Sequence, residues 1–308
     1  MTVIYQNHFL IFYAFRHIFR LMTMNIKNQR KNITTLPGGR RFSWYDSGPV
    51  TGIPVVFCTG AGMSGSLGFG LSYLEHENIR LITPDRPGLG DSSPDAGKSL
   101  KSFAADVTFL MQSLGYPRFR AAGFSQGAVY AMALACYADV SALALISGQD
   151  QFGYPATRAL LSADVIEMQT HARTQPDGFT AWVRDNITAD WLMNFILNYS
   201  GETDLAVYQA ADFLPAYRQC MAEAFSQGNE GYTQDLLLSM QAWGFTPEHI
   251  TCPVSLWYGE KDTSTVHSPD GGKILAGRFP RAEHHLFAEE GGSLLWTQSQ
   301  AILQALAR

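Results

Sequence analysis

The chain has 308 residues, 46% of them hydrophobic, and a formal net charge of −5. This length fits one large α/β domain, or a domain with an inserted segment, and the hydrophobic content can fill a sizeable core. The acidic balance argues against binding nucleic acid over the whole surface. Because no apolar run is long enough to cross a bilayer, we expect no integral membrane segment.

The cysteines are scattered along the chain and show neither metal-ligand spacing nor a disulfide framework. We expect most of them to be buried small hydrophobes in a reducing compartment, which predicts a cytoplasmic protein. No cofactor or metal is implied, because no ligand cluster or phosphate-binding loop is present. The four cysteines are Cys58, Cys136, Cys220 and Cys252.

The N-terminal stretch differs in charge from the rest of the chain. Residues 1–45 contain seven Lys or Arg and no Asp or Glu. Residues 9–15 are apolar, but the basic residues follow this run, which is the wrong order for a secretory signal. An organelle leader or a membrane-surface segment fits such a composition. We favour a simpler interpretation, in which residues 1–32 are a disordered basic extension or translation starts at Met22 or Met24.

The central part of the chain alternates strand-like and helix-like patterns, which predicts a mostly parallel sheet flanked by helices. A hairpin is expected first, around Pro37-Gly38-Gly39. The later strands are continuous apolar runs, as in strands buried on both faces. We predict strands at 33–36, 41–45, 53–57, 79–83, 119–124, 140–146, 253–258 and 283–287, and helices at 69–75, 100–114, 128–137, 272–279 and 293–306.

Residues 148–251 lack any strand pattern and are rich in aromatic residues. We interpret them as a helical cap inserted between the two halves of an α/β core, residues 33–147 and 252–308. Caps of this kind close over a site and exclude water. Because large aromatic side chains tend to be buried, we expect those of the cap to form its core rather than to contact a ligand.

Gly123-Phe124-Ser125-Gln126-Gly127 lies between a predicted strand and a predicted helix. A G-x-S-x-G sequence in this context is typical of a nucleophile elbow, a tight turn that presents a serine hydroxyl. Glycine avoids crowding in such a turn. The start of the following helix places backbone N–H groups near Ser125, where they could stabilise an oxyanion.

With three further motifs, this sequence resembles the α/β-hydrolase superfamily, in particular its small members with a helical cap. The resemblance covers residues 40–308 and implies an α/β-hydrolase fold. The further motifs are Thr59-Gly60-Ala61-Gly62, the segment from Asp85-Arg86-Pro87-Gly88 to Ser92, and Gly259-Glu260-Lys261-Asp262.

The resemblance assigns roles to four residues. Ser125 is the expected nucleophile and Asp262 the acid that orients a histidine. The backbone N–H groups of Ala61 and Gln126 are the expected oxyanion hole. Asp150 is a reserve candidate for the acid. Asp85 and Arg86 are expected to brace the loop beside the site.

The sequence departs from the family at the histidine. The usual spacing places the general base at Gly292, and without a base a serine hydroxyl is a poor nucleophile. His284 and His285 are expected to pack or hydrogen-bond within the last strand. His267 and His171 lie in a loop and in the cap, and Glu289 and Glu290 flank the gap. None of the six is a strong candidate by position, so a histidine at position 292 is expected to raise the activity.

Two functions remain open from the sequence. The first is a serine hydrolase, carboxylesterase-like, acting on a small acyl ester or related carbonyl compound with a degenerate triad and weak activity. The second is a catalytically impaired member that binds or senses a small ligand, because one fold hosts many functions. In either case the expected partner is a small molecule, and the oligomeric state is not indicated.

Overall fold

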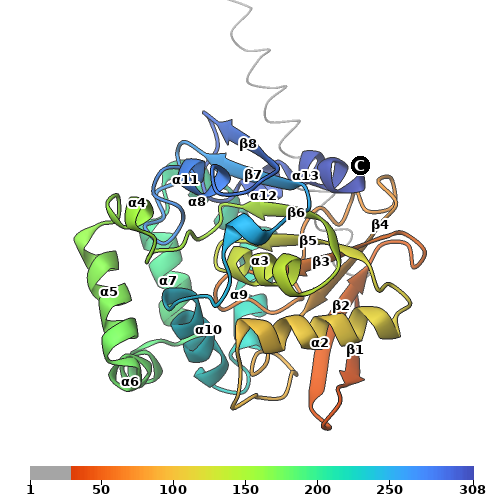
Figure 1. The fold of residues 1–308 in the computed structure, drawn as a ribbon, viewed down its shortest axis with the longest axis horizontal. Helices are drawn as coiled ribbons and strands as arrows, with labels where there is room; N and C mark the ends of the chain where they lie inside the picture. The colour runs from red at the N-terminus through yellow and green to blue at the C-terminus, as the bar shows by residue number, and fades with distance from the viewer. Residues whose placement is uncertain (1–28) are drawn as a thin grey trace, which may run out of the picture.

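The computed structural model describes residues 29–308. A sheet of eight strands runs through the molecule in the order β1-β2-β4-β3-β5-β6-β7-β8 (Figure 1). β2 pairs antiparallel with β1 and β4, and all other neighbours are parallel, which is the mostly parallel sheet that the sequence predicts. The strands are β1 Arg30–Thr35, β2 Arg41–Ser47, β3 Ile53–Cys58, β4 Ile79–Pro84, β5 Phe119–Phe124, β6 Val140–Ile146, β7 Val254–Gly259 and β8 Ala282–Phe287.

Helices cover both faces of the sheet, and successive strand residues serve opposite faces. In β3, Val55 and Phe57 join one hydrophobic core, whereas Val56 and Cys58 join the other. The helices α2 Leu100–Ser113 and α3 Gly127–Tyr137 pack on the second face. The first face is covered by α12 Leu294–Thr297 and α13 Ser299–Ala307, while α11 Lys273–Ala276 precedes β8.

The chain between β6 and β7 consists of helices joined by turns and loops and forms no strand. We call residues 148–251 the helical segment; most of its helices lie to the left of the sheet in Figure 1, and α9 lies near the middle of that view. Its helices are α4 Pro155–Arg158, α5 Ala163–Thr174, α6 Pro176–Asn186, α7 Ala189–Tyr199, α8 Glu202–Tyr208, α9 Phe213–Ala224, α10 Glu230–Met240 and the short 3₁₀ turn η2 Pro247–His249.

Several predicted elements need correction. β1 begins at Arg30, so residues 30–32 are strand rather than disordered extension, and the interpretations of residues 1–28 lie outside the described residues. The helix predicted at 69–75 is wrong: the chain makes turns there, because Gly68 and Gly70 have φ of +59°. The helix predicted at 272–279 shortens to α11, and the last one divides into α12 and α13 around Gln298.

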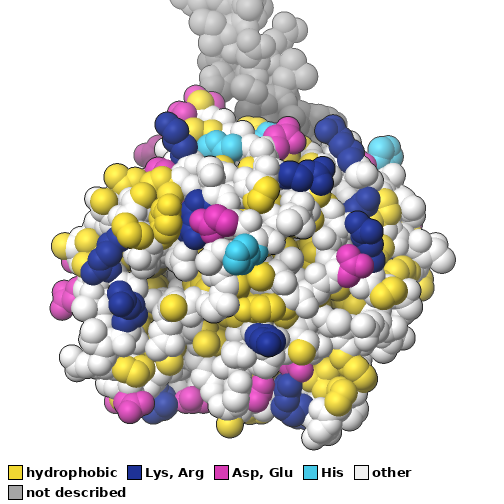
Figure 2. Space-filling model, in the orientation of Figure 1, with side chains coloured by type: hydrophobic (Ala, Val, Ile, Leu, Met, Phe, Trp, Pro, Cys, Tyr) yellow, Lys and Arg dark blue, Asp and Glu magenta, His cyan; other side chains and the backbone are white. Residues whose placement is uncertain are grey.

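On the face shown in Figure 2, acidic and basic side chains are interspersed, and hydrophobic side chains gather near α4. Within residues 29–308, no helix has both the length and the hydropathy that crossing a bilayer requires. The loops that follow β3, β5, β6 and β7 leave the same edge of the sheet, since parallel strands end together. In open α/β sheets this edge is where ligands bind.

Candidate active site

The turn between β5 and α3 places Ser125 at its tip with φ of +53°, a left-handed conformation that non-glycine residues rarely adopt. The flanking glycines are required by close contact. A Cβ atom at Gly127 would lie 2.1 Å from the carbonyl oxygen of Cys58, and one at Gly123 would lie 2.6 Å from that of Gly127. The strained angle of the elbow therefore belongs to the serine, and the glycines let the strand and helix approach.

Ser125, His267 and Asp262 form a continuous chain of hydrogen bonds. Ser125 Oγ lies 2.9 Å from His267 Nε2, and His267 Nδ1 lies 2.6 Å from Asp262 Oδ2. Because a carboxylate only accepts, a neutral imidazole here carries its proton on Nδ1 and leaves Nε2 to accept from the serine hydroxyl. His267 is 7% exposed, so the ring is shielded from bulk water.

A single loop after β7 positions both Asp262 and His267. The Ser264 N–H donates to Asp262 Oδ1 at 2.9 Å, and the Asp262 N–H donates to the carbonyl of Gly259. The Ser268 N–H reaches the carbonyl of Gly148 at 3.0 Å, which ties the loop to the chain after β6. The loop thus folds back on itself, and the five-residue separation brings the imidazole to Ser125.

Two backbone N–H groups beside Ser125 are available to a ligand. Among residues 29–308, no acceptor binds the N–H of Ala61 or that of Gln126, and both residues line the same cavity as Ser125. The loop that carries Ala61 is held from behind by the buried Arg86. Its guanidinium donates to the carbonyl oxygens of Thr59 at 2.6 Å and Gly60 at 2.9 Å.

A buried ionic cluster holds Arg86 in turn. Asp235 on α10 accepts from Arg86 Nε at 2.7 Å, from Tyr130 Oη at 2.7 Å and pairs with Lys98 Nζ at 2.5 Å. Burial raises the pKa of the Asp235 carboxyl, but the charges of Arg86 and Lys98 outweigh this and lower its pKa overall. The helical segment therefore contributes a charge that helps to fix the Ala61 loop.

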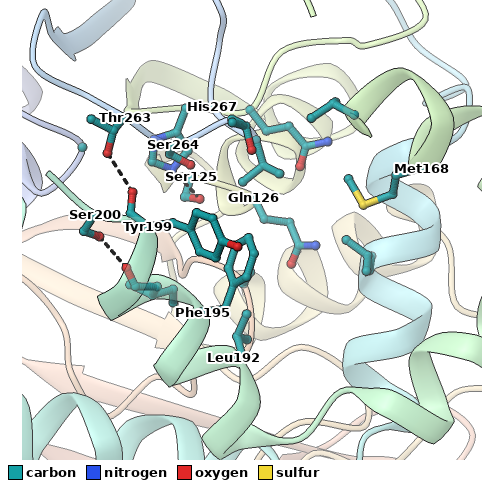
Figure 3. A pocket seen from close by; sticks show the side chains of 18 of the residues that line it. Ser125, Gln126, Met168, Leu192, Phe195, Tyr199, Ser200, Thr263, Ser264 and His267 are labelled. Carbon is teal, nitrogen blue, oxygen red and sulfur yellow. Dashed lines mark hydrogen bonds between the residues drawn. The ribbon is translucent and has the colours of Figure 1, made fainter. Parts of the chain in front are cut away.

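The cavity above Ser125 has a volume of about 440 Å³ and lies between the sheet edge and the helical segment. Ser125, Gln126 and His267 form one wall, and Leu192, Phe195 and Met168 reach the cavity from α7 and α5 (Figure 3). Some aromatic residues of the segment are buried: Phe213 and Trp243 lie away from the cavity as predicted, whereas Tyr208 and Tyr217 are buried but line it. Others are not, since Trp182, Trp191 and Tyr199 are 49%, 42% and 68% exposed.

The structure corrects the expectation that no base is within reach of Ser125. The position where the family would place it, Gly292, adjoins Asp262: a Cβ atom there would lie 2.8 Å from Asp262 Oδ1. The N–H groups of Gly292 and Ser293 instead donate to Asp204 on α8, at 3.1 and 2.7 Å. Burial raises the pKa of the Asp204 carboxyl. This loop is therefore tied to the helical segment, and the imidazole that contacts Ser125 belongs to His267 in the loop after β7.

The other histidines weighed from the sequence lie elsewhere. His284 bonds to the carbonyl of Gly271 at 2.7 Å, and His285 stacks on Trp257 with centroids 4.1 Å apart, as expected of packed strand histidines. His171 lies on α5 with its ring edge against Phe179.

The carboxylates that were considered as alternatives are also engaged with other groups. Asp150, the reserve acid, is buried and accepts from Gln151, Thr157 and Ser268 rather than from a histidine; burial raises its pKa. Glu289 pairs with Lys261, and Glu290 accepts from Thr297 and Gln298. Within the described part of the chain, no group of three or more His, Cys, Asp or Glu side chains could hold a metal ion.

Comparison with known proteins finds a matching family and a related protein. A family model described as "Alpha/beta hydrolase family" matches residues 55–304. A protein of Klebsiella pneumoniae that carries the name "Putative carbamate hydrolase RutD" is 30% identical over 188 residues, which cover 57% of this chain and 68% of that protein.

Two solved structures resemble this chain over most of its length and of their own. An esterase from Thermogutta terrifontis has a TM-score of 0.69 at 19% identity, covering 90% of this chain and 96% of its own. An enol-lactonase from Burkholderia xenovorans has a TM-score of 0.66 at 18% identity, covering 89% and 98%. At these identities the likeness establishes the fold.

Proposed function

The chain belongs to the alpha/beta hydrolase family, and we propose that it is a serine hydrolase that cleaves a small acyl ester or a related carbonyl compound. We assign Ser125 as the nucleophile, His267 as the general base and Asp262 as the acid that orients the imidazole. The observation that carries the proposal is the hydrogen-bond chain of 2.9 and 2.6 Å that links these three side chains.

The first half of the reaction forms an acyl-enzyme. Ser125 Oγ attacks the carbonyl carbon while its proton passes to His267 Nε2, and Asp262 stabilises the imidazolium that results. The carbonyl oxygen becomes an oxyanion and accepts from the N–H groups of Ala61 and Gln126. When this intermediate collapses, the bond to the leaving oxygen breaks, and His267 returns the proton so that an alcohol departs.

Hydrolysis of the acyl-enzyme repeats these steps with water as the nucleophile. His267 removes a proton from water, the hydroxide adds to the acyl carbon, and the same two N–H groups hold the oxyanion. Collapse breaks the bond to Ser125 Oγ, which recovers its proton from His267. The net reaction is ester plus water to acid plus alcohol, and it leaves the protein unchanged.

The alternative, a catalytically impaired ligand-binding protein, depended on the absence of a base. Because His267 lies within hydrogen-bonding distance of both Ser125 and Asp262, nothing specific now favours that alternative. The relative named for carbamate hydrolysis suggests carbamates as a second class of carbonyl compound to assay, alongside esters.

The test is hydrolysis of p-nitrophenyl acetate by the purified protein and three variants. We expect Ser125→Ala and His267→Ala to lower kcat by roughly 10⁴-fold or more, and Asp262→Asn by a smaller but large factor. His171→Ala is the matched control and should retain the wild-type rate, since its ring packs against Phe179. Wild-type activity that survives Ser125→Ala would disprove the assignment of the nucleophile.

A further inference from the structure

We propose that the substrate of this site is an uncharged ester that carries an aromatic ring, and that this ring stacks on an aromatic ladder on α7. The ladder consists of Trp191, Phe195 and Tyr199, which recur at every fourth residue and therefore share one face of the helix. The inference names the substrate class and rests on the serine hydrolase function proposed above.

The ladder is pre-arranged for stacking. The rings of Trp191 and Phe195 have centroids 5.2 Å apart and an interplanar angle of 11°, and those of Phe195 and Tyr199 are 4.6 Å apart at 33°. All three side chains line the cavity that contains Ser125. Trp191 and Tyr199 nevertheless leave 42% and 68% of their surface exposed. Buried aromatic residues elsewhere in the segment, such as Tyr208, Phe213 and Tyr217, cover one another's rings. The exposed ring surface of the ladder is not covered in this way and is available to a ligand.

Contacts at both ends fix the ladder relative to Ser125. Near the C-terminal end of α7, Thr263 Oγ1 donates to the carbonyl of Tyr199 at 2.9 Å (Figure 3). The same oxygen accepts from the N–H of Gly201 at 3.0 Å. Thr263 directly follows Asp262. Toward the other end, Leu192 touches the Ala61 loop, since a Cβ atom at Gly62 would lie 2.6 Å from its Cδ2. A substrate carbonyl bound at Ser125 therefore has the ladder within reach.

The charges around the cavity are the reason for proposing an uncharged substrate. Among residues 29–308, no Lys or Arg lines the cavity, whereas Asp164, Asp204 and Asp262 do. Of the cations nearby, Arg86 is buried against Asp235, and Lys261 is paired with Glu289. A carboxylate on the substrate would therefore lose part of its hydration without gaining a cationic partner, and it would meet like charge.

These interactions set the size of the expected effects. Aromatic pairs gain roughly 2- to 10-fold in binding over the same area of saturated surface. A desolvated and unpaired carboxylate loses roughly 100-fold or more. The site should therefore discriminate modestly for an aromatic ring and strongly against an anion.

The experiment compares kcat/KM for matched esters with the wild-type protein. Benzyl acetate against cyclohexylmethyl acetate places the ring in the alcohol, and methyl phenylacetate against methyl cyclohexylacetate places it in the acid. We expect the aromatic ester to be favoured about 2- to 10-fold in at least one pair. We expect 4-carboxybenzyl acetate to be hydrolysed roughly 100-fold less well than benzyl acetate. Equal rates within both pairs, or equal rates for the last two esters, would overturn the proposal.

A variant isolates the ladder. Phe195→Leu keeps an apolar side chain but removes the central ring, so the aromatic preference should fall toward one. Tyr137→Leu is the control, because Tyr137 is also a partly exposed aromatic residue (36%) but does not line the cavity. It should retain both the activity and the preference. If the aromatic preference persisted in Phe195→Leu, the ladder would not be its cause.

Binding without turnover separates this inference from the proposed function. Calorimetry with Ser125→Ala should show tighter binding of phenylacetamide than of cyclohexylacetamide. If the wild-type protein hydrolyses none of the esters but Ser125→Ala shows this difference in binding, the hydrolase proposal fails and the aromatic site stands. If the two amides bind equally, the aromatic site fails whatever the esterase activity.

Discussion

Introducing a histidine at position 292, where relatives of this family are expected to carry the base, should lower the activity rather than restore it. A Cβ atom at Gly292 would lie 2.8 Å from Asp262 Oδ1 and 3.0 Å from its Cγ. The carboxylate cannot yield easily, because Oδ2 contacts His267 and Oδ1 accepts the Ser264 N–H. The structure thus reverses what the sequence alone leads us to expect of Gly292→His.

The distances give the size of the effect. Ordinary van der Waals contact begins at about 3.4 Å, so the carboxylate must retreat by about 0.6 Å, which stretches its 2.6 Å contact with His267. A misplacement of about 1 Å at a catalytic group can lower a rate roughly 100-fold. We expect kcat to fall about 10- to 100-fold in Gly292→Ala. The fall should be larger in Gly292→His, whose imidazole also competes for Asp262.

The assay is kcat for p-nitrophenyl acetate, with thermal unfolding as the check on folding. Gly277→Ala is the matched control: an added Cβ atom there would meet only carbonyl oxygens at 3.5 and 3.6 Å, so the rate should not change. A folded Gly292→His variant that is faster than the wild type would refute this reasoning and would place the working base after β8.

Three further predictions concern stability, each measured by chemical unfolding. Asp235→Asn should lower the free energy of unfolding by about 3–5 kcal/mol, because it leaves the buried Arg86 and Lys98 without their counter-charge; a loss below about 1 kcal/mol would contradict the cluster. Burial raises the pKa of Asp85 to about 6, so the folded state binds this proton more tightly than the unfolded chain. Stability from this group should fall as the pH rises, by about 1.5 kcal/mol between pH 5 and 7.5, and Asp85→Asn should remove that slope. Finally, Ser125→Gly should be about 1 kcal/mol more stable than Ser125→Ala, because only glycine relaxes at φ of +53°.

Much of the fold could be predicted from local patterns. The buried parallel strands read as continuous apolar runs because both of their faces are covered, as Val55 to Cys58 illustrate. The helix predicted at 69–75, where glycine residues interrupt the chain, does not form. Gly68 and Gly70 both have φ of +59°, and a Cβ atom at Gly70 would lie 2.6 Å from Leu303 near the C-terminal end of the chain. Such a contact with a distant residue is not visible in a local pattern.

The candidate site, like the fold, could be predicted from the sequence only in part. Ser125 and Asp262 could be proposed because each follows a strand in a recognisable motif, and their catalytic roles stay proposals until they are measured. His267 was only one of several histidines, because its reach to Ser125 depends on how residues 260–268 fold back against Gly148. The available signal was the five-residue spacing from Asp262 within one loop, and spacing alone does not fix that turn.

The most direct test of the central claim, that His267 activates Ser125, is the rate at which a fluorophosphonate labels the serine. Peptide mass spectrometry should locate the label on Ser125 in the wild-type protein. His267→Ala should slow labelling by roughly 1,000-fold or more, whereas His284→Ala, which removes a histidine bonded to Gly271, should not change it. Labelling of Ser125 at the wild-type rate in His267→Ala, or labelling of a different residue, would contradict the account.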